Sequence, residues 1–134
     1  MISNLAVSQI LAIVIVMIVL DGIWLTATNA TTRPMFAALQ GQPLKVRWIP
    51  TLFVYAIMVA ALWYFAVAPS STSVTDAMGR GAALGFSMYG LYDLTNYATL
   101  ERYTLDFALT DMAWGTFLFT VTSAVAATIA AIKA

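Results

Sequence analysis

Four long stretches of apolar residues dominate the chain, and shorter polar segments separate them. Each stretch is about as long as the roughly 20 apolar residues that a helix needs to cross a membrane. A strand is excluded because a lone strand in lipid leaves its backbone polar groups unpaired. The sequence therefore predicts an all-α integral membrane protein, a four-transmembrane-helix bundle that forms a single domain over 1–134. The predicted helices lie at about 5–27, 48–68, 77–98 and 107–132.

Polar segments between these stretches predict the connections. The longest connection is predicted at 29–47, and a polar turn follows the second helix. Ser73 or Thr75 in this turn is suited to cap the third helix, because a hydroxyl there can accept a hydrogen bond from a free backbone N–H. Asp106 occupies the position expected for the cap of the fourth helix.

Basic residues indicate an orientation. Four spans place both termini on one side of the membrane, and cytoplasmic segments tend to carry more Lys and Arg. The side with the 29–47 connection is therefore predicted to be cytoplasmic and both termini outside, with a plasma or inner membrane as the default location. The basic residues on that side are Arg33, Lys45, Arg47 and Arg102, and those on the other side are Arg80 and Lys133. An aromatic belt near the cytoplasmic face is predicted from Trp24, Trp48 and Tyr103.

Composition narrows the chemistry further. The chain is 62% hydrophobic and 9% charged, whereas soluble domains are about a quarter charged. Its net charge is zero, without the basic cluster that nucleic-acid binding requires. It contains no cysteine and no histidine, which excludes disulfides, thiolate catalysis and histidine-based metal sites. Any chemistry must use carboxylates, hydroxyls, amides or the few basic side chains.

Three aspartates inside or at the edge of the apolar stretches are the candidate site. Counting residues from the helix ends places Asp21, Asp93 and Asp111 at a similar depth, about 6–9 Å inside the connection side at 1.5 Å per residue. Charged side chains at such depths are costly and usually face the bundle or water. The sequence therefore predicts one acidic layer built from three helices, although a purely structural polar network also explains these residues.

Each aspartate has an aromatic or amide neighbour three or four residues away, on the same helical face. Trp24 follows Asp21 and Trp114 follows Asp111, while Tyr89 and Asn96 flank Asp93. These seven residues are the predicted ligand-binding set. The same faces carry small residues that allow helices to approach closely, so we expect them to be packed. Those small residues are Ala77, Gly81, Gly85, Gly115, Ser123 and Ala127.

Three segments resemble the DUF2177 family of small membrane proteins, whose function is unknown. They are DGIWL at 21–25, which matches a D-x-x-W-L signature, YDLTNYAT at 92–99 and DMAWG at 111–115. The similarity extends over nearly the whole chain and is weakest between residues 28 and 42. The resemblance implies four helices and an acidic motif set, and it supplies no activity.

Three functions are compatible with these observations. The first is binding or transport of a cation, a proton or a small cationic substrate at the acidic layer, with aromatic rings as cation–π walls. The second is a lipid-modifying enzyme or its accessory subunit, in which Asp93, Asn96 and Asp111 would hold Mg²⁺ or Ca²⁺. The third is a structural or assembly partner of another membrane protein. Apart from these functions, the sequence is compatible with a homodimer or with association with another membrane protein. Membrane lipid is a partner in every case. We place the binding or transport hypothesis first.

Overall fold

Helices account for all the regular structure in the computed structural model, which describes residues 3–70 and 73–133. The four long helices are α1 (Asn4–Gln40), α2 (Trp48–Leu62), α3 (Val74–Thr99) and α4 (Leu105–Lys133). α2 continues into one π-helical turn, η1 (Trp63–Val67), and then into a 3₁₀ turn, η2 (Ala68–Ser70). The all-α fold and the four predicted helices are confirmed. Residues 71–72 of the predicted polar turn lie outside the described residues, as does the side chain of Lys133.

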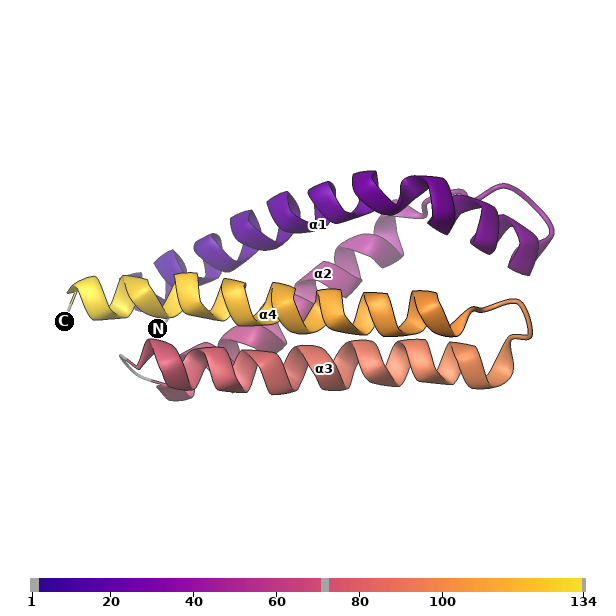
Figure 1. Cartoon of the computed structure of the whole chain (residues 1–134). Coiled ribbons are helices and arrows are strands. Elements are labelled where there is room, and N and C mark those ends of the chain that lie inside the picture. Colours follow the sequence, from indigo (N-terminus) through magenta and orange to yellow (C-terminus); the bar gives the residue numbers. More distant parts are fainter. Residues whose placement is uncertain (1–2, 71–72, 134) are drawn as a thin grey trace.

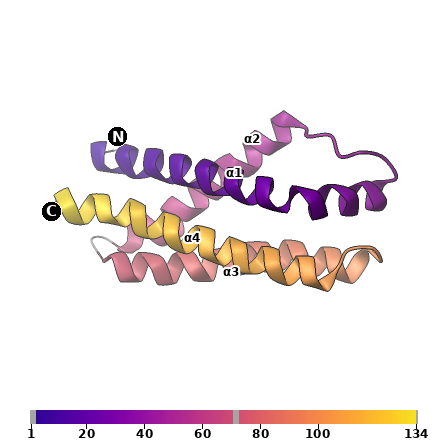
Figure 2. The same ribbon diagram turned by 45° about the horizontal axis from the view of Figure 1, so that its top comes forward.

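Figure 1 shows α3 and α4 lying side by side and antiparallel, with α1 on the opposite side of α4. α2 runs obliquely through the bundle, behind α4 in Figure 1 and behind α1 in Figure 2, and its continuation η1 reaches α3. The two ends of the chain lie at one end of the bundle (Figure 1). The α1–α2 and α3–α4 connections lie at the other end, as expected for four successive spans.

Side-chain caps mark the start of three helices, and at α1 Ser3 Oγ accepts a hydrogen bond of 3.1 Å from the backbone N–H of Ala6. Ser73 Oγ accepts a hydrogen bond of 3.2 Å from the backbone N–H three residues on, so the predicted cap of α3 is confirmed at this residue. Thr104 Oγ1 does the same for α4 at 3.3 Å. The predicted cap Asp106 instead lies in the first turn of α4, where a carboxylate still interacts favourably with the helix dipole.

The prediction for the end of the first helix was wrong. α1 continues to Gln40, so most of the connection predicted at 29–47 is helical. Apolar length marks only the part of a helix that lies in lipid, and a helix can extend beyond it. Pro34 lies within the extension, where its missing N–H removes one helical hydrogen bond. The axis of α1 changes direction in this part of the helix (Figure 1), as expected near a proline.

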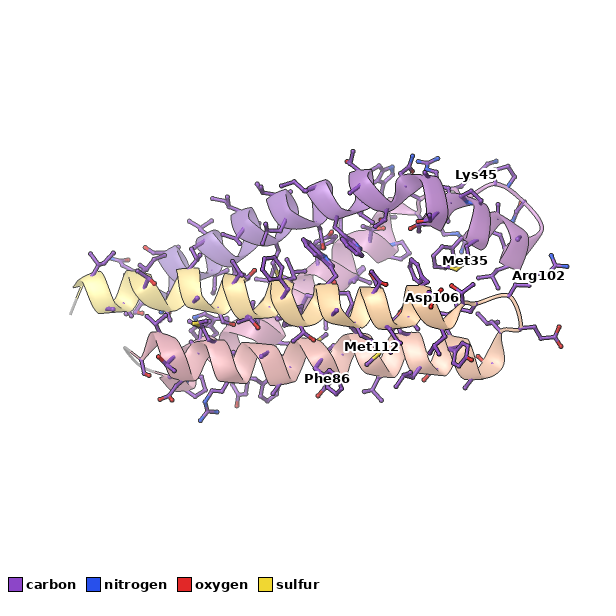
Figure 3. All side chains as sticks on the ribbon, viewed as in Figure 1. Met35, Lys45, Phe86, Arg102, Asp106 and Met112 are labelled. Atoms are coloured by element: carbon purple, nitrogen blue, oxygen red, sulfur yellow. The ribbon has the colours of Figure 1, made fainter. Side chains whose placement is uncertain are left out.

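Two contacts satisfy carbonyl groups at the C-terminus of α1. Gly41 adopts a left-handed conformation with φ of 72°, and its N–H donates to the Ala37 carbonyl at 2.9 Å. A residue with a β-carbon rarely adopts this conformation, which explains a glycine here. The Arg102 guanidinium donates to the Ala38 carbonyl at 3.2 Å. Figure 3 places Arg102 beside the far end of α1, so the α3–α4 connection contacts the last turn of α1.

Membrane-spanning length and apolarity differ among the helices. Three segments of the described chain are long and apolar enough to cross a membrane: Asn4–Gln40, Trp48–Ser70 and Leu105–Ile132. α3 has 26 residues, which is long enough, but Asp76, Arg80, Asp93 and several glycines make it less apolar. α3 lies alongside α4 over most of its length (Figure 1), so it extends through the same part of the bundle as its more apolar neighbour.

The apolar core lies in the middle of the bundle and towards the termini. α1 contributes Ile13 and Met17, α2 contributes Leu62, and α4 contributes Leu118 and Phe119, all with no exposed surface. Asp21, Asp93 and Asp111 lie beyond this core, towards the connections.

Four of the six small residues predicted to pack lie between α3 and α4: Gly81, Gly85, Gly115 and Ser123. A β-carbon on Gly85 would overlap the backbone carbonyl of Gly115, and one on Gly81 would lie 2.6 Å from the Phe119 carbonyl. Ser123 packs directly against Gly81. The two helices therefore touch through their backbones along this line, as small residues at helix interfaces allow.

Candidate functional site

Two reciprocal hydrogen bonds join α1 to α4. The indole N–H of Trp24 donates to Asp111 Oδ1 at 3.1 Å, and the indole N–H of Trp114 donates to Asp21 Oδ1 at 3.1 Å. Each helix carries an aspartate followed three residues later by a tryptophan. Because the helices are antiparallel, the aspartate of each faces the tryptophan of the other. Each helix thus contributes one donor and one acceptor.

The two indole rings stack between the aspartates. Their centroids lie 4.7 Å apart and their planes are 4° from parallel. We call Asp21, Trp24, Asp111 and Trp114 the Asp–Trp cluster. The stack fixes both rings, which in turn fixes the direction of their N–H groups. The cluster is therefore one polar contact between α1 and α4, made by two hydrogen bonds and one ring stack.

The two carboxylates of the cluster differ in the number of hydrogen bonds that their oxygens accept. Asp21 is 7% exposed, and its second oxygen, Oδ2, accepts a hydrogen bond of 2.8 Å from the hydroxyl of Tyr55 on α2. Asp111 is only half-buried, and among the described residues its Oδ2 accepts no hydrogen bond. Asp111 therefore keeps one carboxylate oxygen available to a ligand.

A cavity of about 240 Å³ lies against the cluster, and residues of α1, α2, α3 and α4 line it. All four cluster residues line it, and Tyr55 and Tyr89 add two further aromatic rings. Tyr89 is held over Gly115, where any β-carbon would collide with its ring. The cavity thus combines two carboxylates with several aromatic surfaces. Its remaining lining residues are Leu25, Thr28, Thr32, Phe36, Val54, Met58, Tyr92 and Phe107.

Asp93 is placed in a different contact. It has no exposed surface, and it is absent from the lining of the cavity. The hydroxyl of Tyr103 donates to Asp93 Oδ1 at 2.5 Å, while Oδ2 has no hydrogen-bond partner among the described residues. Asn96 is partly buried close to the hydroxyls of Tyr92 and Tyr103. The structure thus brings Asp21 and Asp111 into one cavity and holds Asp93 and Asn96 beside it.

Tyr103 lies in the connection between α3 and α4. Burial raises the pKa of its hydroxyl above the usual value, and the hydrogen bond to Asp93 raises the pKa further. The hydroxyl therefore stays protonated and remains a donor to the carboxylate. Its position also corrects the predicted aromatic belt: Tyr103 is 2% exposed and Trp24 is stacked inside the cluster, whereas Trp48 is 72% exposed.

The family model for the predicted membrane proteins called DUF2177 matches residues 6–128. The chain belongs to the DUF2177 family. No curated protein and no solved structure matches it. Two of the segments that carry the resemblance, at 21–25 and 111–115, contain the Asp–Trp cluster. In this DUF2177 protein the two motifs are thus the two halves of one contact.

The three predicted metal ligands do not line one cavity in this DUF2177 protein. Within residues 3–70 and 73–133, no three acidic side chains gather closely enough to hold a metal ion. Asp111 lines the cavity, but Asp93 and Asn96, the other predicted ligands, do not. The side chains around the cavity are mainly aromatic and apolar. Mg²⁺ and Ca²⁺, in contrast, take six or more oxygen ligands.

Sequence reasoning missed two tyrosines that complete the polar contacts. Tyr55 is a hydroxyl-bearing residue in an otherwise apolar helix, and it donates to Asp21. Tyr103 donates to Asp93 on α3 from the connection that follows α3. A buried carboxylate needs donors, and a tyrosine on a neighbouring segment at the same depth was the available signal.

Proposed function

We propose that this protein binds a small organic ammonium ion in the cavity beside the Asp–Trp cluster. The observation that carries the proposal is the free oxygen of Asp111 within a cavity walled by aromatic rings. An ammonium group can donate a hydrogen bond to that oxygen, or pair with it by charge alone, while its methylene or methyl groups contact the rings.

The charge of the site favours a cationic ligand. Asp21 and Asp111 line the same cavity, and no Lys or Arg among the described residues pairs with either carboxylate. Neutral N–H and O–H donors hold the carboxylates in place, but they do not cancel charge. Uncompensated charge at membrane depth is costly, so a bound cation would be stabilised there.

The walls favour an organic cation over a metal ion. Ring faces attract cations through their quadrupole and are the usual surroundings of quaternary ammonium groups. Tyr89 and Tyr92 line the cavity in addition to the stacked indoles. A metal ion would gain little from rings and would lack oxygen ligands. The volume of about 240 Å³ suits a small head group and not a large molecule.

A binding protein and a transporter share the binding step, and this step can be measured directly. The protein is placed in nanodiscs of phosphatidylglycerol, which has no ammonium group, and its unfolding free energy is measured with and without tetramethylammonium. A ligand at 100 times its Kd stabilises a protein by about 2.7 kcal/mol. Ethylammonium, Na⁺, Mg²⁺, Ca²⁺ and neutral tert-butanol are compared in the same way.

Asp111→Asn removes the charge that the ligand would meet, and Asp106→Asn is the matched control, because Asp106 is exposed in the first turn of the same helix. We expect the organic ammonium ions to stabilise the parent and the control but not Asp111→Asn. Stabilisation by Mg²⁺ or Ca²⁺ instead would support the metal-dependent enzyme. Absence of any ligand effect in the parent would overturn the proposal and favour the assembly partner.

A further inference from the structure

A second hollow adjoins the cavity. It is a groove of about 880 Å³ between α1 and α2, lined almost entirely by apolar side chains. Tyr55 lines both the groove and the cavity, so one residue forms the boundary between them. The groove faces outward, since Ile18 is 57% exposed and Leu52 is 68% exposed. In a membrane these surfaces meet lipid.

Two hydrogen bonds, one from α1 to α2 and one from α1 to η1, the continuation of α2, bound this groove. At the end near the connections, Tyr55 donates to Asp21 at 2.8 Å. Towards the termini, the indole N–H of Trp63 donates to Gln9 at 3.3 Å, and Gln9 is 5% exposed. Only apolar side chains line α1 between these two bonds. The two helices are thus tied together at both ends and hollowed between.

The length of the groove matches one leaflet. Along α1 it is lined by Ile18, Val14 and Ile10, which step away from Asp21 at helical spacing. Ile10 lies 11 residues before Asp21 (21 − 10), which corresponds to about 16 Å at 1.5 Å per residue. Half of a hydrocarbon core of about 30 Å is nearly the same length. One acyl chain therefore fits between the acidic cavity and the Gln9–Trp63 contact.

We infer that the ligand is a membrane amphiphile with an ammonium head group, whose head binds beside Asp111 and whose chain lies in the α1–α2 groove. The inference rests on the proposed function, because it assigns a tail to the cation bound there. Charge complementarity selects the head, and the membrane supplies the chain. Lipid tails are as apolar as the groove, so its contribution is packing and position. A fixed tail holds the head at the depth of the carboxylates.

The test compares the binding of dodecyltrimethylammonium and of tetramethylammonium to the protein in phosphatidylglycerol nanodiscs. Binding is measured as the change in tryptophan fluorescence. Dodecanol and dodecyl sulfonate have the same chain without the cation, and they control for effects of the chain on the bilayer. Ala60→Phe fills the groove, and Ala83→Phe is the matched control on the exposed surface of α3, outside the groove. Both variants are first checked for an unchanged circular dichroism spectrum.

We expect Ala60→Phe to weaken the binding of dodecyltrimethylammonium at least about tenfold. The chain and the head group are linked, so blocking the site of the chain removes its contribution to affinity. Tetramethylammonium should bind the parent, Ala60→Phe and Ala83→Phe equally. If both cations bind in an Asp111-dependent way but Ala60→Phe has no effect on the long chain, the proposed function stands and the tail assignment is wrong. If the binding of neither cation depends on Asp111, both proposals fail. Binding of dodecanol as tight as that of the cation would also overturn the inference.

Discussion

The α3–α4 pair and the α1–α2 pair are held together in different ways. α3 and α4 touch through their backbones where Gly81 and Gly85 meet α4, and a β-carbon there has no room. α1 and α2 are joined by the Tyr55–Asp21 and Trp63–Gln9 hydrogen bonds, with a groove between them. Close backbone packing leaves no space for a ligand. The proposed binding surfaces lie where the packing is loose, beside the α1–α2 pair.

The largest effect is expected from a bulky residue inside the tight pair. Gly85→Leu forces α3 away from α4, because a β-carbon at this position overlaps the Gly115 carbonyl. We expect a loss of unfolding free energy at or above the upper end of the range for overpacking, about 3 kcal/mol. Reversible unfolding in mixed micelles measures it.

Gly79→Leu is the control for that variant, since nothing lies within 4 Å of the position where its β-carbon would be. Leucine is a better helix former than glycine, so this change should be neutral or stabilising by up to about 1 kcal/mol. Equal losses in both variants would show that α3 and α4 are not in backbone contact.

A smaller effect is expected at the end of the tight pair, where Tyr103 is the hydrogen-bond donor to Asp93. Tyr103→Phe leaves a fully buried carboxylate without a partner, which should cost about 1–3 kcal/mol. Tyr97→Phe, at a residue that is 45% exposed on α3, should change stability little. In an Asp93→Asn background the cost of Tyr103→Phe should fall. An unchanged cost there would mean that the two residues are not coupled.

The smallest effect is expected in the loose pair. Tyr55→Phe removes one hydrogen bond to Asp21 but leaves the bond from Trp114, so the carboxylate keeps a donor. We expect a loss of about 0.5–1.5 kcal/mol in unfolding free energy. Tyr64→Phe is the control, because Tyr64 is 63% exposed. A loss larger than that of Tyr103→Phe would reverse the comparison and make the α1–α2 contact the stronger one.

The fold could be predicted from the sequence to a large extent because a membrane restricts a short chain to helices. Apolar length located the four helices, but it could not show that α1 continues past Pro34 to Gln40. That extension has little apolar character, and contacts from other segments, such as the Arg102–Ala38 hydrogen bond, lie at its end. Such contacts depend on tertiary structure, which a count of apolar residues does not contain.

The candidate site was predicted in part. Helical spacing placed Trp24 beside Asp21 and Trp114 beside Asp111 on shared faces. It could not show that each tryptophan would bond the aspartate of the other helix, since this depends on how far α1 and α4 are shifted along one another. Depth alone grouped Asp93 with the other two aspartates. Depth does not specify the direction in which a helix face points, and α3 turns Asp93 towards Tyr103.

The reciprocal Asp–Trp bonds have a consequence for how the protein is made. They join residues 87 and 93 positions apart in the chain, on the first and the last of the four helices. During synthesis α1 enters the membrane well before α4, so for that interval Trp24 lacks its acceptor and Asp21 has only the donor from α2, Tyr55. A buried carboxylate that lacks one of its donors is costly, and it tends to move towards water or accept a proton. We therefore expect α1 to reach its final depth only after α4 is inserted.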